Sequence, residues 1–120
     1  MNLFKKIAKT QNEKSFILEE HFRGFKAFPI VVHGDKDAET GNKKLAKTHL
    51  PGKTIRFVKA GSAYSVQIDA YHVGMIYDSD TIKRINKIEK VYAKIDEETV
   101  IGTKTTATRP RIHLFVKEKQ

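Results

Sequence analysis

The sequence predicts a mainly β protein with minor α: a small, partly open β-barrel with one inserted helix and a short N-terminal helix. Three observations indicate this fold. Short apolar runs alternate with polar residues along most of the chain, one capped helix interrupts them, and the length of 120 residues suits one domain. Closure into a barrel is expected because it leaves so small an all-β domain few exposed strand edges.

The charge balance is strongly basic, with 23 Lys and Arg against 14 Asp and Glu and a formal net charge of +9. This balance favours polyanions or anionic surfaces as partners, although basic residues can also serve solubility alone. The chain has no cysteine, so disulfides and thiolate chemistry are excluded and only His and carboxylates remain as zinc ligands. The absence of cysteine fits a reducing, cytoplasmic setting. Apolar residues never run on for the length of a membrane span, so we expect a soluble protein without a membrane partner.

Residues 1–25 are predicted to form a helix and a linker, ahead of a single barrel domain at residues 26–120. Apolar residues recur at helical spacing over residues 2–10 with lysines on the opposite side, which indicates a short amphipathic helix. From Phe16 to Phe28 the apolar residues keep no regular period. This segment is therefore expected to be an irregular linker.

Six or seven short strands are expected in the barrel. Residues 27–32 are β-branched and aromatic with Pro29 among them, which predicts an edge strand or the first strand of the domain. A brief helix is expected around residues 43–47, before Pro51. Period-two alternation predicts strands near residues 55–58, 66–68, 71–77, 90–95 and 112–117, and the Thr-rich residues 99–105 are expected to form another.

Two short polar segments are expected to be turns between these strands: the pair Asp69-Ala70 and the triplet Asp96-Glu97-Glu98. A helix is predicted from residue 79 to about residue 87. Asp78 is a good N-cap, and Ile82 and Ile85 share one face of that helix, which should pack on the barrel.

The last strands are predicted to present a face that mixes cations with aromatic rings. The side chains expected to face the core are those of Val91, Ala93, Ile95, Ile112, Leu114 and Val116. Alternation then places on the opposite face Lys90, Tyr92, Lys94, Arg111, His113, Phe115 and Lys117. Cations beside rings are typical of proteins that bind single-stranded nucleic acid. The alternative is a solvated face with covered rings: exposure of Tyr92 and Phe115 favours nucleic acid, and burial of both favours a protein partner.

A second basic stretch lies between Glu39 and Asp69, where the sequence has no acidic residue. Its cations are Lys43, Lys44, Lys47, Lys53, Arg56 and Lys59. They are candidates for phosphate contacts or, equally, for a solvated loop. Gly61, Ser62 and Ser65 follow directly, and exposed amides there could bind a phosphate, although no glycine-rich phosphate-binding signature is present.

Catalytic and metal-binding motifs are not evident. The five histidines have no metal-ligand spacing: they are His21, His33, His49, His72 and His113. Asp78 and Asp80 are explained by helix capping, and the serines lack a nucleophile elbow. We therefore expect no enzyme, no cofactor and no metal site.

The strand Val73-Gly74-Met75-Ile76, placed directly before a helix, resembles the HIRAN family, and so does the order of elements over residues 26–118. Gly74 is expected to be required there because another backbone approaches closely. The resemblance implies an OB-like small barrel that recognises DNA, in some members the 3′ end of a single strand, and that serves a helicase-like or nuclease partner. The family has Asn-Pro-Tyr-Asp before the preceding strand, with Tyr and Asp in the pocket for the DNA end. This chain has Gly61-Ser62-Ala63-Tyr64 and lacks the Asp.

The sequence therefore predicts a nucleic-acid-binding module, foremost for single-stranded DNA or DNA ends, that acts by phosphate contacts and aromatic stacking. The alternative is a small interaction or regulatory protein, of the kind that phages and mobile elements encode, whose basic face docks an acidic protein partner. Net charge does not separate the two.

Overall fold

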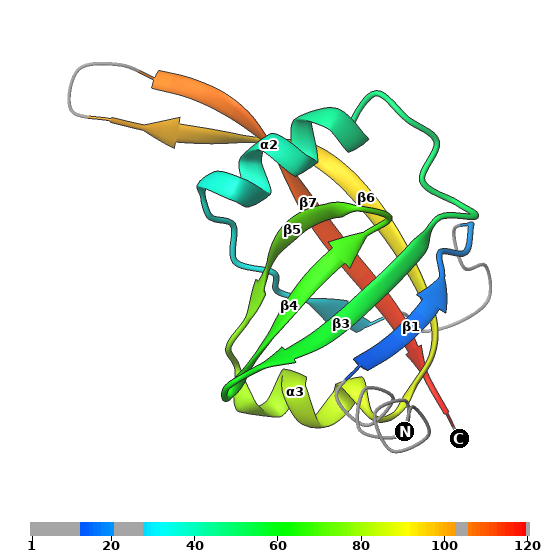
Figure 1. Cartoon of the computed structure of the whole chain (residues 1–120). Coiled ribbons are helices and arrows are strands. Elements are labelled where there is room, and N and C mark those ends of the chain that lie inside the picture. The colour runs from blue at the N-terminus through cyan, green and yellow to red at the C-terminus, as the bar shows by residue number, and fades with distance from the viewer. Residues whose placement is uncertain (1–12, 21–27, 103–105, 120) are drawn as a thin grey trace, which may run out of the picture.

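The protein is described by a computed structural model in which residues 13–20, 28–102 and 106–119 are placed. This part of the chain is mainly β with minor α, as predicted (Figure 1). Its strands are β1 Glu13–Ile17, β2 Phe28–Ile30, β3 Thr54–Ala60, β4 Ala63–Ile68, β5 Tyr71–Ile76, β6 Ile88–Ile101 and β7 Thr106–Glu118, and its helices are α2 Lys36–Leu45 and α3 Ser79–Ile85. The N-terminal helix predicted for residues 2–10 lies outside the described residues.

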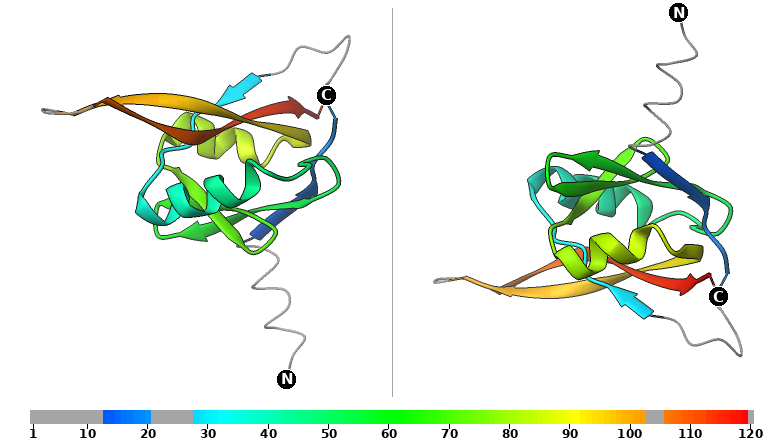
Figure 2. Two further views of the ribbon diagram at one scale, coloured as in Figure 1. Left: turned by 90° about the horizontal axis from the view of Figure 1, so that it is seen from above. Right: turned by 90° about the horizontal axis from the view of Figure 1, so that it is seen from below.

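The strands form two antiparallel sheets, which face each other and enclose the core (Figure 2). One sheet has the strand order β1-β3-β4-β5 and the other the order β2-β7-β6. Two short seams join them. The backbones of His33 and Met75 exchange two hydrogen bonds of 2.8 Å, and the Glu19 N–H donates to the Val91 carbonyl at 2.8 Å. The result is the partly open small barrel that the sequence predicts.

Apolar side chains from both sheets and both helices fill the space between the sheets. The largest fully buried side chains are those of Phe57, Leu18, Leu45, Ile55, Ile68, Ile76, Ile85, Ile88, Ile112, Leu114, Val66 and Val73. Val91 and Val116 are also fully buried. Ala93 and Ile95 are partly buried against this core. The predicted inward face of β6 and β7 is therefore confirmed.

The seam between β2 and β5 depends on Gly74. Its φ of +147° is a backbone conformation that side chains rarely adopt. A Cβ built at Gly74 would lie 2.7 Å from the His33 carbonyl oxygen and would also collide with the Val32 side chain. The close backbone approach expected at this glycine is present.

Helix α2 begins seven residues earlier than the brief helix predicted around residues 43–47. Its N-cap is Asp35, whose Oδ1 accepts the Ala38 N–H at 2.7 Å. The helix packs against β5 and β7. Gly41 lies so close to the His72 carbonyl that a Cβ there would collide with it, so this packing accounts for a glycine inside a helix.

Helix α3 agrees with its prediction. Asp78 is the N-cap, and its Oδ2 accepts the Thr81 N–H at 2.9 Å. Ile85 is 1 % exposed, and Ile82 packs partly buried against the core. The two helices lie at opposite ends of the barrel (Figure 1).

Strand β1 corrects the linker predicted from Phe16. It pairs with β3 in register from Glu13 opposite Val58 to Ile17 opposite Thr54. The Phe16 ring packs edge-on against Phe57 with 6.0 Å between centroids. A single edge strand of five residues shows too little alternation to be recognised in the sequence, but its cross-strand contacts make it part of the barrel.

The polar turn predicted at Asp96-Glu97-Glu98, and with it the separate strand near residues 99–105, is wrong. Residues 88–101 form one continuous strand, in which Asp96 lies opposite Arg111. Opposite charges across strands stabilise the pairing, which offsets the low strand propensity of Asp96. The β6–β7 hairpin therefore runs on past the barrel as an arm (Figure 1).

The turn predicted at Asp69-Ala70 is confirmed as the link between β4 and β5. Asp69 has a φ of 51°, in the left-handed region that Asp tolerates better than most residues. Among the residues that the structure describes, no helix has the length and apolar character needed to cross a membrane.

Candidate nucleic-acid interface

The outer face of the β2-β7-β6 sheet brings together the cations and rings predicted for it. We call this surface the basic face and define it by Lys90, Tyr92, Lys94, Arg111, His113, Phe115 and Lys117. The register places Lys90 opposite Lys117, Tyr92 opposite Phe115, Lys94 opposite His113 and Asp96 opposite Arg111. Rows of cations therefore flank one aromatic row.

The aromatic row is a closed stack. The rings of Tyr92 and Phe115 lie 4.8 Å apart between centroids with 12° between their planes. Tyr92 is 6 % exposed, and Phe115 is half-buried. The expectation that both rings are open to nucleobases is therefore not met, and neither is burial of both. Each ring already uses one face against the other, which leaves little of Tyr92 for a ligand.

Cations of the basic face differ in how far they are neutralised. Lys117 Nζ lies 3.4 Å from a Glu89 carboxylate oxygen, and His113 Nε2 lies 3.8 Å from one of Asp96. Lys90 and Lys94, by contrast, form no ion pair within the described residues. These two ammonium groups are the part of the basic face best able to meet an external anion.

Lys94 has a defined position above the stack. Its Nζ lies 6.0 Å from the Tyr92 ring centroid and 5.9 Å from the Phe115 ring centroid. Such contacts attract a cation to the ring faces by about 0.5–1 kcal/mol at exposed sites. The stack therefore positions an exposed charge.

Arg111 has a structural partner on the neighbouring segment. Its Nη2 donates to the Val32 carbonyl oxygen at 3.2 Å, which links β7 to the chain that follows β2. Arg111 as a whole is half-buried. We therefore assign Arg111 to the support of the basic face.

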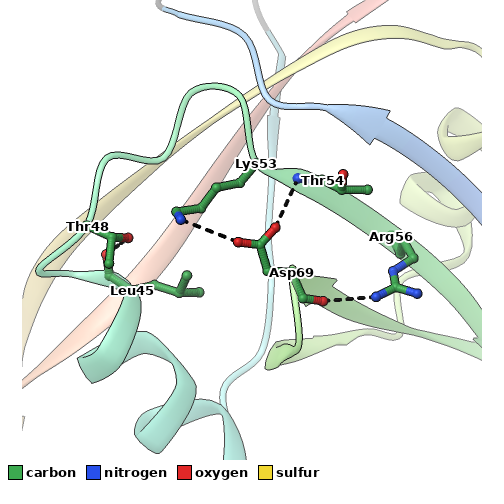
Figure 3. Close-up of polar contacts among 6 residues, drawn as sticks. All are labelled: Leu45, Thr48, Lys53, Thr54, Arg56 and Asp69. Carbon is green, nitrogen blue, oxygen red and sulfur yellow. Dashed lines mark hydrogen bonds and ion pairs between the residues drawn. The ribbon is translucent and has the colours of Figure 1, made fainter.

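The second predicted stretch does not form one patch, because Lys53 and Arg56 have acidic partners that are distant in sequence and the other cations lie on different elements. Figure 3 shows Asp69 among three of its neighbours. Its carboxylate lies 3.3 Å from Lys53 Nζ and accepts the Thr54 N–H at 3.3 Å, and its carbonyl accepts from Arg56 Nη2 at 3.0 Å. Arg56 Nη1 also lies 3.7 Å from a Glu13 carboxylate oxygen. Lys53 and Arg56 thus hold the β4–β5 turn against β3.

The remaining cations of that stretch lie on different elements. Lys43 and Lys44 are in the last turn of α2, Lys47 follows this helix, and Lys59 is exposed near the end of β3. Lys43 pairs with Glu39 at 3.3 Å. A cleft of about 470 Å³ between α2 and the base of the arm is lined by Lys43, Ala46, Lys47, Ile95, Asp96, Glu97 and Pro110. Its charge is mixed, unlike that of the basic face.

The segment that departs from the HIRAN pattern forms the turn between β3 and β4. Gly61 has a φ of +64°, and Ser62 beside it is exposed. Tyr64 is 8 % exposed and belongs to the core. Its ring is therefore not placed to contact a DNA end.

A chain of hydrogen bonds joins Ser65, His72 and Asp35, which the sequence did not indicate. Ser65 Oγ lies 3.1 Å from His72 Nδ1, and His72 Nε2 lies 3.0 Å from Asp35 Oδ2. These are the residue types of a hydrolytic triad. Here Ser65 lies within a strand that pairs on both sides, and Asp35 caps α2. The chain ties the start of α2 to β4 and β5.

Sequence reasoning missed the most exposed rings and apolar groups beside the basic face. Tyr77 is 59 % exposed and Val31 56 %, and both lie at the seam between β2 and β5. His33 is exposed, and its ring centroid lies 5.7 Å from that of Tyr77. Ile76 is buried, so Tyr77 faces the opposite side. Strict alternation would instead place Tyr77 on the side of Val73, which is also buried, so the sequence carries no simple signal for this exposed ring.

No family model, curated protein or solved structure matches the chain. Within the described ranges, no group of three or more His, Asp or Glu side chains is arranged to hold a metal ion.

Proposed function

We propose that the protein is a nucleic-acid-binding module whose basic face contacts the phosphates of single-stranded DNA. The observation that carries this proposal is that Lys90 and Lys94, on either side of the aromatic row, form no ion pair within the described residues. Lys117, opposite Lys90, is already paired with Glu89. A phosphate backbone laid across the face would neutralise the two unpaired charges.

The expected recognition is independent of base sequence. Phosphate contacts position a protein on nucleic acid but carry no base information. The resemblance to HIRAN domains supports DNA as the polyanion. Because Tyr64 is buried and the family's Asp is absent, the proposal does not include the family's pocket for DNA ends.

A binding titration with single-stranded and duplex oligonucleotides at several salt concentrations tests this function. Each phosphate contact should contribute about −0.7 to the slope of log K against log salt on single strands. Affinity should therefore fall steeply as salt rises. Absence of binding at low salt, or binding that salt does not affect, contradicts the proposal and leaves docking of an acidic protein as the role of the basic face.

Two matched double variants locate the contacts. Lys90→Gln with Lys94→Gln removes two charges from the basic face, and Lys44→Gln with Lys47→Gln removes two from the region of α2. The first pair should weaken binding to all sequences alike and reduce the slope by about 1.4, twice the contribution of one contact. The second pair should have a much smaller effect. Equal losses would mean that net charge alone attracts the DNA.

A further inference from the structure

The basic face continues beyond its sheet onto the seam between β2 and β5. β2 pairs with β7 from Phe28 opposite Val116 to Ile30 opposite Leu114. Continuing this antiparallel register places Val31 beside His113 and His33 beside Arg111. The chain is extended here, because Ile30 and Val32 are buried while Val31 and His33 are exposed.

The pairing at the seam between β2 and β5 can be continued to Tyr77. His33 pairs with Met75, so Val31 lies across from Tyr77 when the pairing is continued. On this extrapolated register, Lys94, His113, Val31 and Tyr77 follow one another across four neighbouring chain segments. At about 4.8 Å per segment, the path over the surface from Lys94 to Tyr77 is roughly 14 Å. One oligonucleotide can reach both.

We infer that Tyr77, with His33 beside it, is a stacking site for the unpaired bases of a single strand whose phosphates lie on the basic face. Tyr77 is 59 % exposed, whereas Tyr92, the ring that the sequence favoured for this role, is 6 % exposed. An exposed ring next to cations is the combination that single-stranded nucleic acid requires. Tilted by 43° against Tyr77, the His33 ring supports it from one side. This inference rests on the proposed function and adds a contact to the bases, which a duplex keeps paired and a single strand leaves open.

The test compares two probes of equal length, oligo-dT and an abasic oligonucleotide, each of about ten nucleotides, within the roughly 4–16 that one small barrel covers. Both carry the phosphates, but only oligo-dT carries bases. Tyr77→Ala should weaken binding of oligo-dT at least about fivefold, as expected for one stacked base. Binding of the abasic probe and the salt slope should stay as in the wild type. Tyr77→Phe, which keeps the ring, should bind oligo-dT within about twofold of the wild type.

Tyr71→Ala is the matched control, because Tyr71 is also on the surface, at 37 % exposed, but lies at the far end of β5. It should bind both probes as the wild type does. Unchanged binding of oligo-dT by Tyr77→Ala would overturn the stacking site, and so would an equal loss with the abasic probe or an equal loss in Tyr71→Ala. In each of these cases the wild type still binds and the proposed function stands. If the wild type binds neither probe, both the function and the stacking site are refuted.

Discussion

Asp35 and His72 connect the first turn of α2 to strand β5 by a 3.0 Å contact between Asp35 Oδ2 and His72 Nε2. The other carboxylate oxygen of Asp35 accepts the Ala38 N–H at 2.7 Å as the helix cap. One side chain therefore both starts the helix and docks it on the sheet. The Ala38 hydrogen bond first, and His72 second, hold the pKa of Asp35 below its usual range, against the opposing effect of partial burial.

This lowered pKa predicts a specific loss of stability in acid. A carboxylate whose pKa is depressed by folding stabilises the fold above its unfolded value, near pH 4, and this contribution disappears as the pH falls through the folded value. Asp35→Asn keeps a good N-cap but removes the charge. The unfolding free energy of this variant should therefore fall less than that of the wild type between about pH 5 and about pH 2, a range that spans the pKa of an Asp in an unfolded chain. Urea unfolding at several pH values measures it. Asp37→Asn removes one negative charge from the first turn without removing the cap, and is the control for the loss of charge alone.

Gly74→Ala should destabilise the barrel at its β2–β5 seam. The new Cβ would lie 2.7 Å from the His33 carbonyl oxygen, on a backbone with a φ of +147°. Strain of this kind costs on the order of 1–3 kcal/mol, in addition to the collision. Thermal unfolding should show a lower melting temperature. In Gly34→Ala, where nothing lies within 4 Å of the added Cβ, the melting temperature should change far less.

Ile85→Asp should cost several kcal/mol, because it places a charge at a core position that is 1 % exposed. Lys83→Asp in the same helix is the control, since Lys83 is exposed. Denaturant unfolding measures both. A small effect of Ile85→Asp would mean that α3 does not pack on the barrel as described.

Tyr92→Ala should act on stability rather than on base stacking. Truncating a buried ring costs about 3–5 kcal/mol, to which loss of the Phe115 stack contributes about 0.5–1.5 kcal/mol. Tyr92→Phe keeps the ring and should lose much less. If Tyr92→Ala unfolds at the same denaturant concentration as the wild type, burial of the Tyr92 ring, which is 6 % exposed, does not contribute to the free energy of unfolding.

Elements with regular alternation or a cap were predictable from the sequence. The alternation of β6 and β7 placed Val91 inward and Lys94 outward, and Asp78 marked the start of α3. Asp35 is an equally good cap, but α2 also contains Gly41, which indicates a loop when the sequence alone is considered. A glycine is required at position 41 because the backbone of His72 lies against it, and no local sequence pattern encodes this contact.

Charges were predictable in number but not in pairing. Lys53 and Arg56 have no acidic neighbour in sequence, yet Asp69 meets both in space. Acidic residues in a row suggested a turn, yet Asp96 faces Arg111 across the ladder. Long-range partners decide both cases, and a single sequence does not identify them.

The β6–β7 arm and the barrel are expected to differ in local stability. Among the described strands, β2 adds a neighbour to β7 only from Leu114 to Val116, so beyond Ile112, whose side chain still lies in the core, the hairpin is a two-stranded ladder. A two-stranded ribbon alone is marginally stable in water. Its amides should therefore exchange with deuterium through local opening, at a free energy well below that of global unfolding. Exchange of these amides is therefore expected to be faster than that of the amides in the barrel at the root of the arm.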